Sequence, residues 1–292
     1  MYSHTDLLFG IGRNFYDYRI RRTNMKFFEF GKEHKKLMVL LHGGGVSYLG
    51  ILPTAEYIAQ KFHVVLVAYD GFNPSEPEKE FISVKHEAEQ IADYIIENYG
   101  GKIDVLYGIS YGCRVLCEVI RDKRLNITTT IADGFSTRKY PDIKSDLGKN
   151  LYCFFFTGMF FVIMGRAGKL RKKFLAKITG RTYEEAEKLL YTEATWKSWK
   201  NQDYCLIGQK TDFEAFKNTD MYIWYGINST VERKLARNIK QWQDAGYEFT
   251  LKIFKNVGHG GLAGEHTDRF LKEVMKAHLR SLEKASGENR ES

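Results

Sequence analysis

The stretch from Ile103 to Cys113 constrains the fold of this chain more than any other. Apolar, β-prone residues run up to Gly108, and a helix-like pattern of apolar residues begins at Tyr111. Ser110 stands between them in the pattern Gly-x-Ser-x-Gly, whose glycines remove the Cβ atoms that would clash in a sharp strand-to-helix turn. Such a turn lifts the serine hydroxyl clear of the sheet, where a histidine and a substrate carbonyl can both reach it. Ser110 is therefore the first candidate nucleophile, with an ordinary structural turn as the alternative.

Strands and helices alternate on both sides of this turn. Apolar segments typical of buried strands lie at 25–30, 37–41, 63–69, 127–132, 221–225 and 249–254. Helical patterns lie between or after them at 53–62, 81–99, 231–245 and 262–282. The alternation predicts an α/β fold, with a mostly parallel sheet covered by helices on both faces. The first two strands are joined by a short polar turn, which predicts a hairpin.

Between residues 135 and 218 the alternation stops. This segment has no obvious buried strand and only helical patterns, one of which starts with a capping box at Thr182 and Glu185. An all-helical insertion between two strands predicts a cap over the carboxyl ends of the sheet. We therefore expect a core formed by residues 1–134 and 219–292 and a cap at 135–218, called the cap segment below.

Two further features follow strands, where the side chains of a catalytic site are expected. His42 opens a run of three glycines, and N–H groups of such a loop can stabilise an oxyanion together with the N–H of Tyr111, the residue after the candidate nucleophile. His42 itself is expected to orient the loop. His259 follows the last strand between glycines, and among the eight histidines it alone has both that position and small neighbours. It is the candidate general base.

These motifs resemble those of the α/β-hydrolase superfamily. The resemblance runs from about residue 25 to the final helix, without the cap segment, and rests on the glycine loop at His42, the serine motif at Ser110 and the glycines around His259, in that order. It implies Ser110 as nucleophile, His259 as base, and the backbone amides of Gly44 and Tyr111 as the oxyanion hole. It also implies acyl transfer in two steps, in which His259 first takes the Ser110 proton and later activates water.

The acid of the triad has three candidates. In the superfamily it usually follows the strand after the cap, and here the loop at that place offers Asn228 and Glu232 but no aspartate. Asn228 brings no charge, and the helical context of Glu232 favours a solvated face. The superfamily also uses an acid one strand earlier, where Asp133 could hold the imidazole or cap a turn. Asp133 is preferred, then Glu232, then Asn228, and the geometry of the triad has to decide.

The cap segment carries an apolar stretch followed by a basic one. Residues 151–164 are fourteen uncharged residues, short of the about 20 that span a bilayer, so a buried or pocket-lining helix is expected. Its phenylalanines are expected partly to pack on the core and partly to line a pocket for an apolar acyl or aromatic substrate; they are Phe154, Phe155, Phe156, Phe160 and Phe161. The basic tract from Arg166 to Arg181 is interpreted as a solvated helix face, with weak attraction to an anionic lipid surface or an acidic substrate as alternatives.

Composition argues against several other classes of protein. Hydrophobic residues make up 43% of the chain and aromatic residues 14%, enough for a sizeable core. The formal net charge is +8, but no nucleic-acid recognition motif is present and the basic tract lacks interleaved aromatic residues. No dinucleotide fingerprint, P-loop or metal-ligand spacing is visible, so no cofactor and no metal is expected. The start of the chain lacks the pattern of a signal peptide, which predicts a cytoplasmic protein.

The sequence therefore predicts a cytoplasmic serine esterase that acts on a small or medium apolar acyl ester. Amide, thioester or short-peptide hydrolysis by the same triad is the first alternative. The second is a catalytically weak hydrolase-fold protein that binds a ligand under its cap, because three residues compete for the role of the acid and loss of one triad member leaves only residual catalysis. The sequence does not indicate an oligomeric state.

Overall fold

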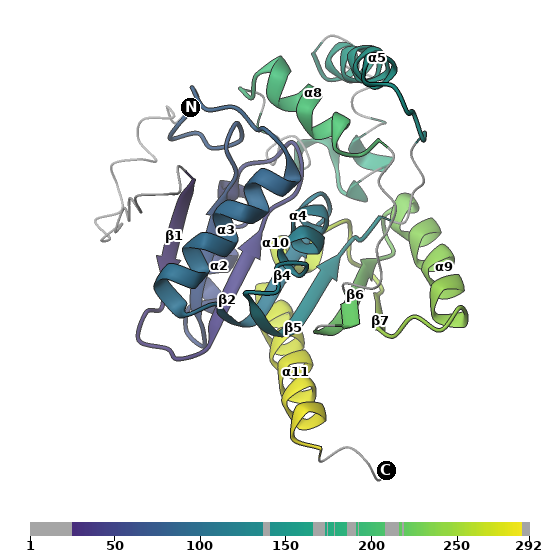
Figure 1. Cartoon of the computed structure of the whole chain (residues 1–292). Coiled ribbons are helices and arrows are strands. Elements are labelled where there is room, and N and C mark those ends of the chain that lie inside the picture. Colours follow the sequence, from purple (N-terminus) through teal and green to yellow (C-terminus); the bar gives the residue numbers. More distant parts are fainter. Residues whose placement is uncertain are drawn as a thin grey trace.

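The computed structural model of this chain is built around one seven-stranded sheet (Figure 1). Its order is β1-β3-β2-β4-β5-β6-β7, and all neighbouring strands are parallel except β1 and β3. The strands are β1 (Lys26–Phe30), β2 (Leu37–Leu41), β3 (His63–Ala68), β4 (Lys102–Ile109), β5 (Asn126–Asp133), β6 (Asp220–Gly226) and β7 (Thr250–Phe254). The predicted α/β class with a mostly parallel sheet is confirmed.

The structure describes most of the chain. The described residues are 25–136, 141–165, 173, 175–177, 179–185, 191, 193–207, 216–217 and 219–287, with the side chains of 160–165 left out. Every structural statement below refers to these residues.

Helices cover both faces of the sheet. On one face α3 (Val84–Tyr99), α4 (Gly112–Val119) and α9 (Thr230–Asp244) pack on side chains such as Val39, Leu106 and Ile223. On the other face α2 (Leu52–Ile58), α10 (Gly261–Glu265) and α11 (Thr267–Ser286) pack on the alternate residues of the same strands, such as Met38 and Trp224. The central strands are buried on both faces, which is why their sequences are continuously apolar rather than alternating. A short 3₁₀ helix, η1 (Tyr48–Gly50), precedes α2.

The predicted hairpin of the first two strands is wrong. β1 pairs with β3, in the register Lys26 to Ala68, and β2 lies between β3 and β4. The burial of the two strands explains the difference. All five residues of β2 are buried, so this strand needs a parallel neighbour on each side, whereas only one residue of β1 is buried and this strand forms an edge of the sheet.

Side chains cap the starts of α3, α8 and α9 among the described helices. Ser83 caps α3 by accepting a hydrogen bond from the N–H of His86 (3.1 Å), and Gly100 ends α3 in the left-handed conformation. Thr54 lies inside α2, and its hydroxyl donates to the carbonyl of Ala263. The helix starts at Leu52, one residue before the predicted segment, with Pro53 at one of its first positions.

Two helices of the cap segment lie above the sheet, at the end to which the parallel strands point (Figure 1). They are α5 (Asp146–Gly165) and α8 (Trp196–Tyr204), and they pack on each other. The capping box is confirmed: the Glu185 carboxylate accepts from the N–H of Thr182 (2.9 Å), and the Thr182 hydroxyl accepts from the N–H of Glu185 (3.3 Å). The exact limits of core and cap stay a prediction.

The uncharged stretch forms a helix, but its expected burial is wrong for part of it. Phe154 and Phe155 are exposed to solvent, and Phe156 is half-buried. The side chains of Phe160 and Phe161 lie outside the described residues. None of the helices in the described part of the chain combines the length and the apolar character that crossing a bilayer requires.

Candidate active site

Ser110 occupies a strained turn between β4 and α4. Its φ is 55°, in the left-handed region that residues with a Cβ avoid. The glycines around it make this turn possible. A Cβ on Gly108 would lie 2.8 Å from the carbonyl oxygen of Gly112, and one on Gly112 would lie 2.6 Å from the carbonyl oxygens of Leu41 and His42. The helix therefore follows the strand closely, and the serine is left half-exposed at the carboxyl end of β4.

His259 lies in the loop after β7 and pairs with Glu232. The Nδ1 of His259 is hydrogen-bonded to Oε1 of Glu232. The carboxylate of Glu232 is completely buried, and its other oxygen accepts from the backbone N–H of Gly226. Ser229 caps the first turn of α9 and thereby aims Glu232 back toward the sheet. The expectation that Glu232 belongs to a solvated helix face is wrong.

Asp133, the acid preferred from the sequence, is hydrogen-bonded to a residue other than His259. Its Oδ2 accepts a hydrogen bond from the hydroxyl of Tyr107 on the neighbouring strand β4 (2.7 Å), and no hydrogen bond among the described residues joins it to His259. Burial, together with the charge of Glu232, raises the pKa of Asp133 to about 7. The third candidate, Asn228, is exposed, and its backbone N–H donates to the carbonyl of Val257 (2.9 Å). The imidazole is therefore paired with Glu232 and not with the acid that the sequence favoured.

The electrostatic setting of His259 favours its charged form. Burial works against the imidazolium, but the negative charge of Glu232 and its hydrogen bond outweigh it and raise the pKa of His259 above its ordinary value. The side chain of His259 is still 19% exposed, so one edge of the ring stays accessible. A histidine that is oriented by a buried carboxylate and accessible on one side can accept a proton from a neighbouring hydroxyl.

Backbone contacts bring the serine turn and the histidine together. The N–H of Ser110 donates to the carbonyl of Asp133 (2.7 Å). The next residue, Gly134, lies against the His259 ring, because a Cβ there would be 2.6 Å from Cε1 of His259 and 2.7 Å from Oε1 of Glu232. Only a glycine leaves room for this pair, and its φ of 69° adds a second reason. The residue had no sequence signal beyond its place directly after a strand.

The glycine loop lies directly beside the serine turn. A Cβ on Gly43 would be 3.5 Å from the Cβ of Ser110, and one on Gly44 would be 2.9 Å from the Cβ of Tyr111. Within the described part of the chain no acceptor is bonded to the backbone N–H of Gly44 or of Tyr111. Backbone N–H groups beside a serine turn, without an acceptor in the described structure, are able to stabilise an oxyanion.

Helix α8 of the cap segment covers this loop. The hydroxyl of Tyr111 donates to the carbonyl of Gln202 (3.1 Å), and the Gln202 side-chain oxygen approaches Gly44. Trp199 packs on Gly45, whose carbonyl accepts from the N–H of Tyr191 (2.9 Å). The surroundings of the glycine loop are thus formed in part by Tyr191, Trp199 and Gln202 of the cap segment, where the sequence indicates only the phenylalanines as candidate pocket residues.

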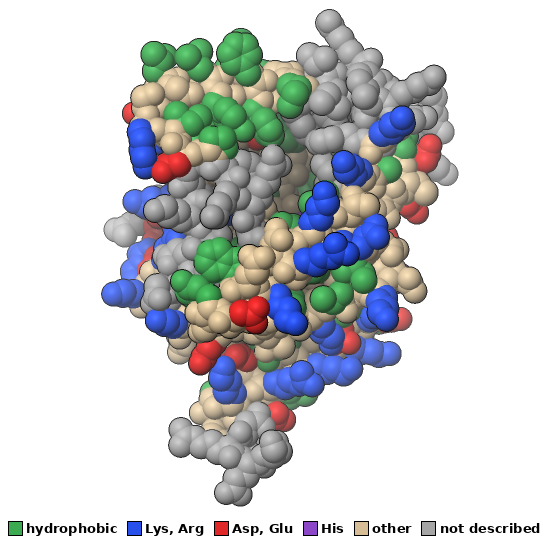
Figure 2. Space-filling view, turned by 90° about the vertical axis from the view of Figure 1, so that its right-hand side faces the viewer, with side chains coloured by type: hydrophobic (Ala, Val, Ile, Leu, Met, Phe, Trp, Pro, Cys, Tyr) green, Lys and Arg blue, Asp and Glu red, His purple; other side chains and the backbone are tan. Residues whose placement is uncertain are grey.

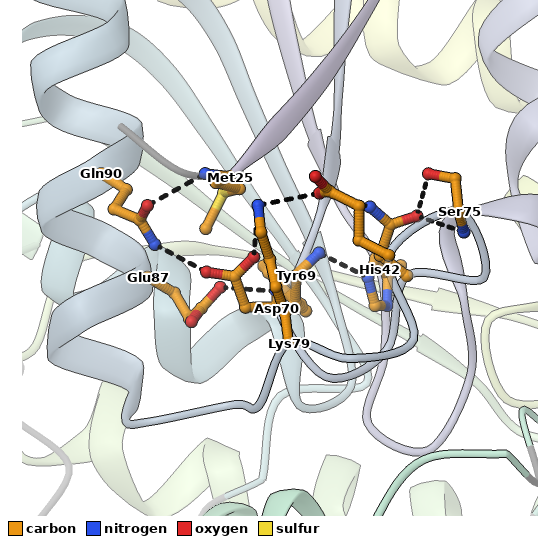
Figure 3. Close-up of polar contacts among 10 residues, drawn as sticks. Met25, His42, Tyr69, Asp70, Ser75, Lys79, Glu87 and Gln90 are labelled. Atoms are coloured by element: carbon orange, nitrogen blue, oxygen red, sulfur yellow. Dashed lines mark hydrogen bonds and ion pairs between the residues drawn. The ribbon is translucent and has the colours of Figure 1, made fainter. Parts of the chain in front are cut away.

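His42 connects the glycine loop to the end of β3, where Tyr69 donates to its ring (Figure 3). It is completely buried, its Nδ1 lies 2.9 Å from the carbonyl oxygen of Gly43, and its Nε2 accepts from the N–H of Tyr69 (3.3 Å). Burial lowers the pKa of His42 to about 4, so the ring is neutral at physiological pH. A neutral, backbone-bonded imidazole orients a loop and has no free edge for proton transfer.

A buried acidic cluster begins at Asp70, the residue after Tyr69 (Figure 3). Asp70, His86 and Glu87 each place one ligand atom within 4.8 Å of the others, which is the only such group of metal-ligating side chains in the described residues. Asp70 accepts from the side chain of Gln90 (3.2 Å) and lies 3.7 Å from the ammonium of Lys79. The ammonium already offsets the charge that a metal ion would neutralise, so we assign no metal to this cluster.

The cap segment also holds the histidine loop. The N–H of His259 donates to the carbonyl of Thr179 (2.6 Å), and the carbonyl of His259 accepts from the guanidinium of Arg181 (2.7 Å). Arg181 is also paired with Glu265, and its side chain is only 7% exposed. The interpretation of the basic tract as a solvated helix face is therefore wrong for Arg181. Lys173 and Lys177 are exposed, as that interpretation predicts. Arg166, Lys169, Arg171 and Lys172 lie outside the described residues.

Comparison with known proteins supports the fold. No protein-family model and no curated protein matches this sequence. An esterase from Thermogutta terrifontis has a similar structure, with a TM-score of 0.65 at 14% identity over 92% of this chain and 99% of that one. A carboxylesterase structure from Nitrososphaera gargenis gives 0.66 at 12% identity over 92% and 99%, and the epoxide hydrolase CorEH gives 0.65 at 15% over 91% and 99%. The chain has the α/β-hydrolase fold.

Proposed function

We propose that this protein is a serine hydrolase that cleaves a carboxylic ester with a small or medium apolar acyl group. One observation carries the proposal: Ser110, in a strained turn, donates its N–H to the carbonyl of Asp133, and the next residue, Gly134, lies against the ring of His259, which is hydrogen-bonded to the buried carboxylate of Glu232. Strain at a non-glycine residue costs about 1–3 kcal/mol and persists where function requires it. The esterases among the similar structures agree with this chemistry.

The first half of the reaction forms an acyl-enzyme. Ser110 Oγ attacks the ester carbonyl while His259 Nε2 takes the hydroxyl proton, and Glu232 stabilises the imidazolium that results. The oxyanion of the tetrahedral intermediate accepts hydrogen bonds from the N–H groups of Gly44 and Tyr111. The intermediate then collapses: the bond to the alcohol oxygen breaks, and His259 returns the proton to that oxygen, so the alcohol leaves.

The second half releases the acid. His259 takes a proton from water, the hydroxide attacks the acyl carbon, and the proton returns to Ser110 as the carboxylic acid departs. In this proposal Glu232 takes the place of Asp133 as the acid of the triad, because Glu232 is the carboxylate hydrogen-bonded to Nδ1 of His259. Asp133 becomes a support of the turn, through the bond from its carbonyl to the N–H of Ser110.

The test combines a substrate series with a covalent probe. We expect hydrolysis of p-nitrophenyl esters from acetate to laurate, with a maximum at the chain length that the pocket under the cap accepts. A fluorophosphonate should label the protein, because this probe requires an activated serine. Ser110→Ala should abolish both signals, with about a 10⁴-fold or larger loss of kcat.

The matched control is Ser286→Ala, which removes an exposed hydroxyl at the end of α11. It should leave turnover and labelling unchanged. If the folded protein shows neither labelling nor turnover of any ester, the hydrolase proposal fails and a ligand-binding role takes its place. If it is labelled but turns over no ester, the serine is active and amide or thioester substrates are tested next.

A further inference from the structure

An ordinary surface helix turns its apolar side toward the protein and its polar side toward solvent. In the described part of α5 several large apolar side chains are exposed to solvent instead. Its side toward α8 is polar or small: Cys153 and Thr157 are completely buried there. The hydroxyl of Thr157 donates to the carboxylate of Asp203 on α8 (2.5 Å), and Asn150 accepts from the ammonium of Lys200 (3.3 Å). In the described part of α5, these two hydrogen bonds and the edge-to-face contact of Phe154 with Trp196 therefore attach this helix to α8.

Five large apolar side chains of α5 are nevertheless exposed to solvent. The residues that we call the α5 apolar face are Leu147 (73% exposed), Leu151 (51%), Phe154 (56%), Phe155 (71%) and Met159 (56%). Relative to Leu147 they stand at positions i, i+4, i+7, i+8 and i+12, which places them on one side of the helix. Figure 2 shows hydrophobic side chains gathered along the top of the molecule, where α5 lies. Soluble monomers rarely expose so many large apolar side chains together unless another surface covers them.

The charge of the surrounding sequence indicates what covers it. Residues 141–181 contain nine basic and two acidic residues, a formal charge of +7 out of +8 for the whole chain. Lys173 and Lys177, within this segment, are exposed. Large apolar side chains on a helix within a strongly basic segment are typical of helices that lie in the headgroup region of an anionic bilayer.

We propose that the α5 apolar face docks the cap on the surface of a bilayer that contains anionic phospholipid. A second copy of the chain would fit the apolar side chains but would bring the same basic segment against itself, because a two-fold interface pairs identical surfaces. An anionic surface satisfies both features at once. The proposal does not depend on the esterase proposal, since binding is measured without substrate.

The experiment is co-sedimentation of the full chain with vesicles of phosphatidylcholine, alone or mixed with phosphatidylglycerol. The wild type should bind the mixed vesicles and bind phosphatidylcholine alone at least about tenfold more weakly. Leu151→Ser with Phe155→Ser should weaken binding to the mixed vesicles about 10- to 100-fold. The matched control is Leu279→Ser with Leu282→Ser on α11, two apolar residues that are 47% and 39% exposed and should not affect binding.

A second pair of variants tests the charge. Lys173→Glu with Lys177→Glu should weaken binding to mixed vesicles by more than about tenfold, whereas Lys272→Glu with Lys276→Glu on α11 should have a much smaller effect. Turnover of the soluble substrate p-nitrophenyl acetate and circular dichroism report whether each variant is folded. Absence of wild-type binding to the mixed vesicles would overturn the proposal. So would equal losses in the α5 and α11 variants, or a wild-type dimer that the α5 variant dissociates.

Discussion

Two largely buried pairs of a histidine with a glutamate in the described residues have different surroundings. His259 and Glu232 lie at the carboxyl ends of the strands, beside the strained Ser110. His63 and Glu29 lie at the β1–β3 edge, where Nε2 of the histidine is 2.7 Å from the carboxylate. His63 is the first residue of β3, so this second pair is at the opposite end of the sheet from the serine.

The partners of the two carboxylates explain the difference. Glu29 also accepts hydrogen bonds from the hydroxyls of Tyr94 and Tyr99 (2.6 Å each) and is paired with Lys32. Burial alone would raise its pKa, but the hydrogen bonds from His63, Tyr94 and Tyr99 lower it to about 2. This carboxylate stabilises the edge of the sheet. A histidine–carboxylate pair is therefore a catalytic candidate only where a nucleophile and free backbone donors lie next to it.

The largest effect should come from Glu232→Gln. Loss of the charge that orients and stabilises the imidazolium should lower kcat for p-nitrophenyl esters about 10³- to 10⁴-fold, while the fold persists. Steady-state kinetics with circular dichroism as a folding check measures this. A loss of less than about tenfold would contradict Glu232 as the acid.

Two variants serve as its controls. Asp133→Asn should change kcat by less than about tenfold, and a loss of several orders of magnitude would return the role to Asp133. Glu29→Gln should leave kcat unchanged and lower the unfolding temperature, because a buried hydrogen-bonded carboxylate contributes about 1–3 kcal/mol. A substitution in the catalytic pair should thus lower kcat, whereas a substitution in the structural pair should lower the unfolding temperature.

A smaller effect is expected for Gly134→Ala. The new Cβ would lie 2.6 Å from the His259 ring and should displace it enough to lower kcat about 10²-fold. Gly246→Ala is the matched control: its φ is also positive, at 88°, but nothing lies within 4 Å of the added atom. Both variants carry the cost of a left-handed alanine, about 1–2 kcal/mol, so an equal loss of kcat in both would contradict a steric role for Gly134.

The smallest effect concerns the pH profile. His259 must be neutral to act as base, so kcat/KM should rise with pH as the imidazolium loses its proton. Glu232 raises the pKa of His259, so this rise should occur at higher pH than for an ordinary histidine. In Glu232→Gln the residual activity should rise at lower pH, because burial then acts without the compensating charge. A profile that is identical in both proteins would show that Glu232 does not act on His259.

The sequence predicts the parts of the site that local patterns determine. The turn at Ser110 and the loop at His259 each need glycines at fixed positions after a strand, and the structure places both at strand ends. The partner of His259 could not be deduced in this way. It depends on the angle at which α9 leaves β6, which the cap at Ser229 and the packing of the helix determine. This angle cannot be predicted from the spacing of residues along the chain.

Tertiary context also decided the remaining differences. β1 pairs with β3 because the sheet supplies two parallel neighbours for β2, which outweighs the short connection between the first two strands. Arg181 is buried within a basic tract because two acceptors, the carbonyl of His259 and the carboxylate of Glu265, lie within its reach. Neither arrangement has a signature in the residues themselves.

Thr179 and Arg181 are hydrogen-bonded to the backbone of His259, and these bonds limit which parts of the cap segment can be exchanged with another protein. Exchange of residues 135–218 for the equivalent segment of another hydrolase would import a new specificity pocket but remove both anchors of the general base. A graft that stops before Leu175 would keep them. Engineering of this protein should therefore treat residues 175–181 as belonging to the catalytic core, although they lie within an insertion.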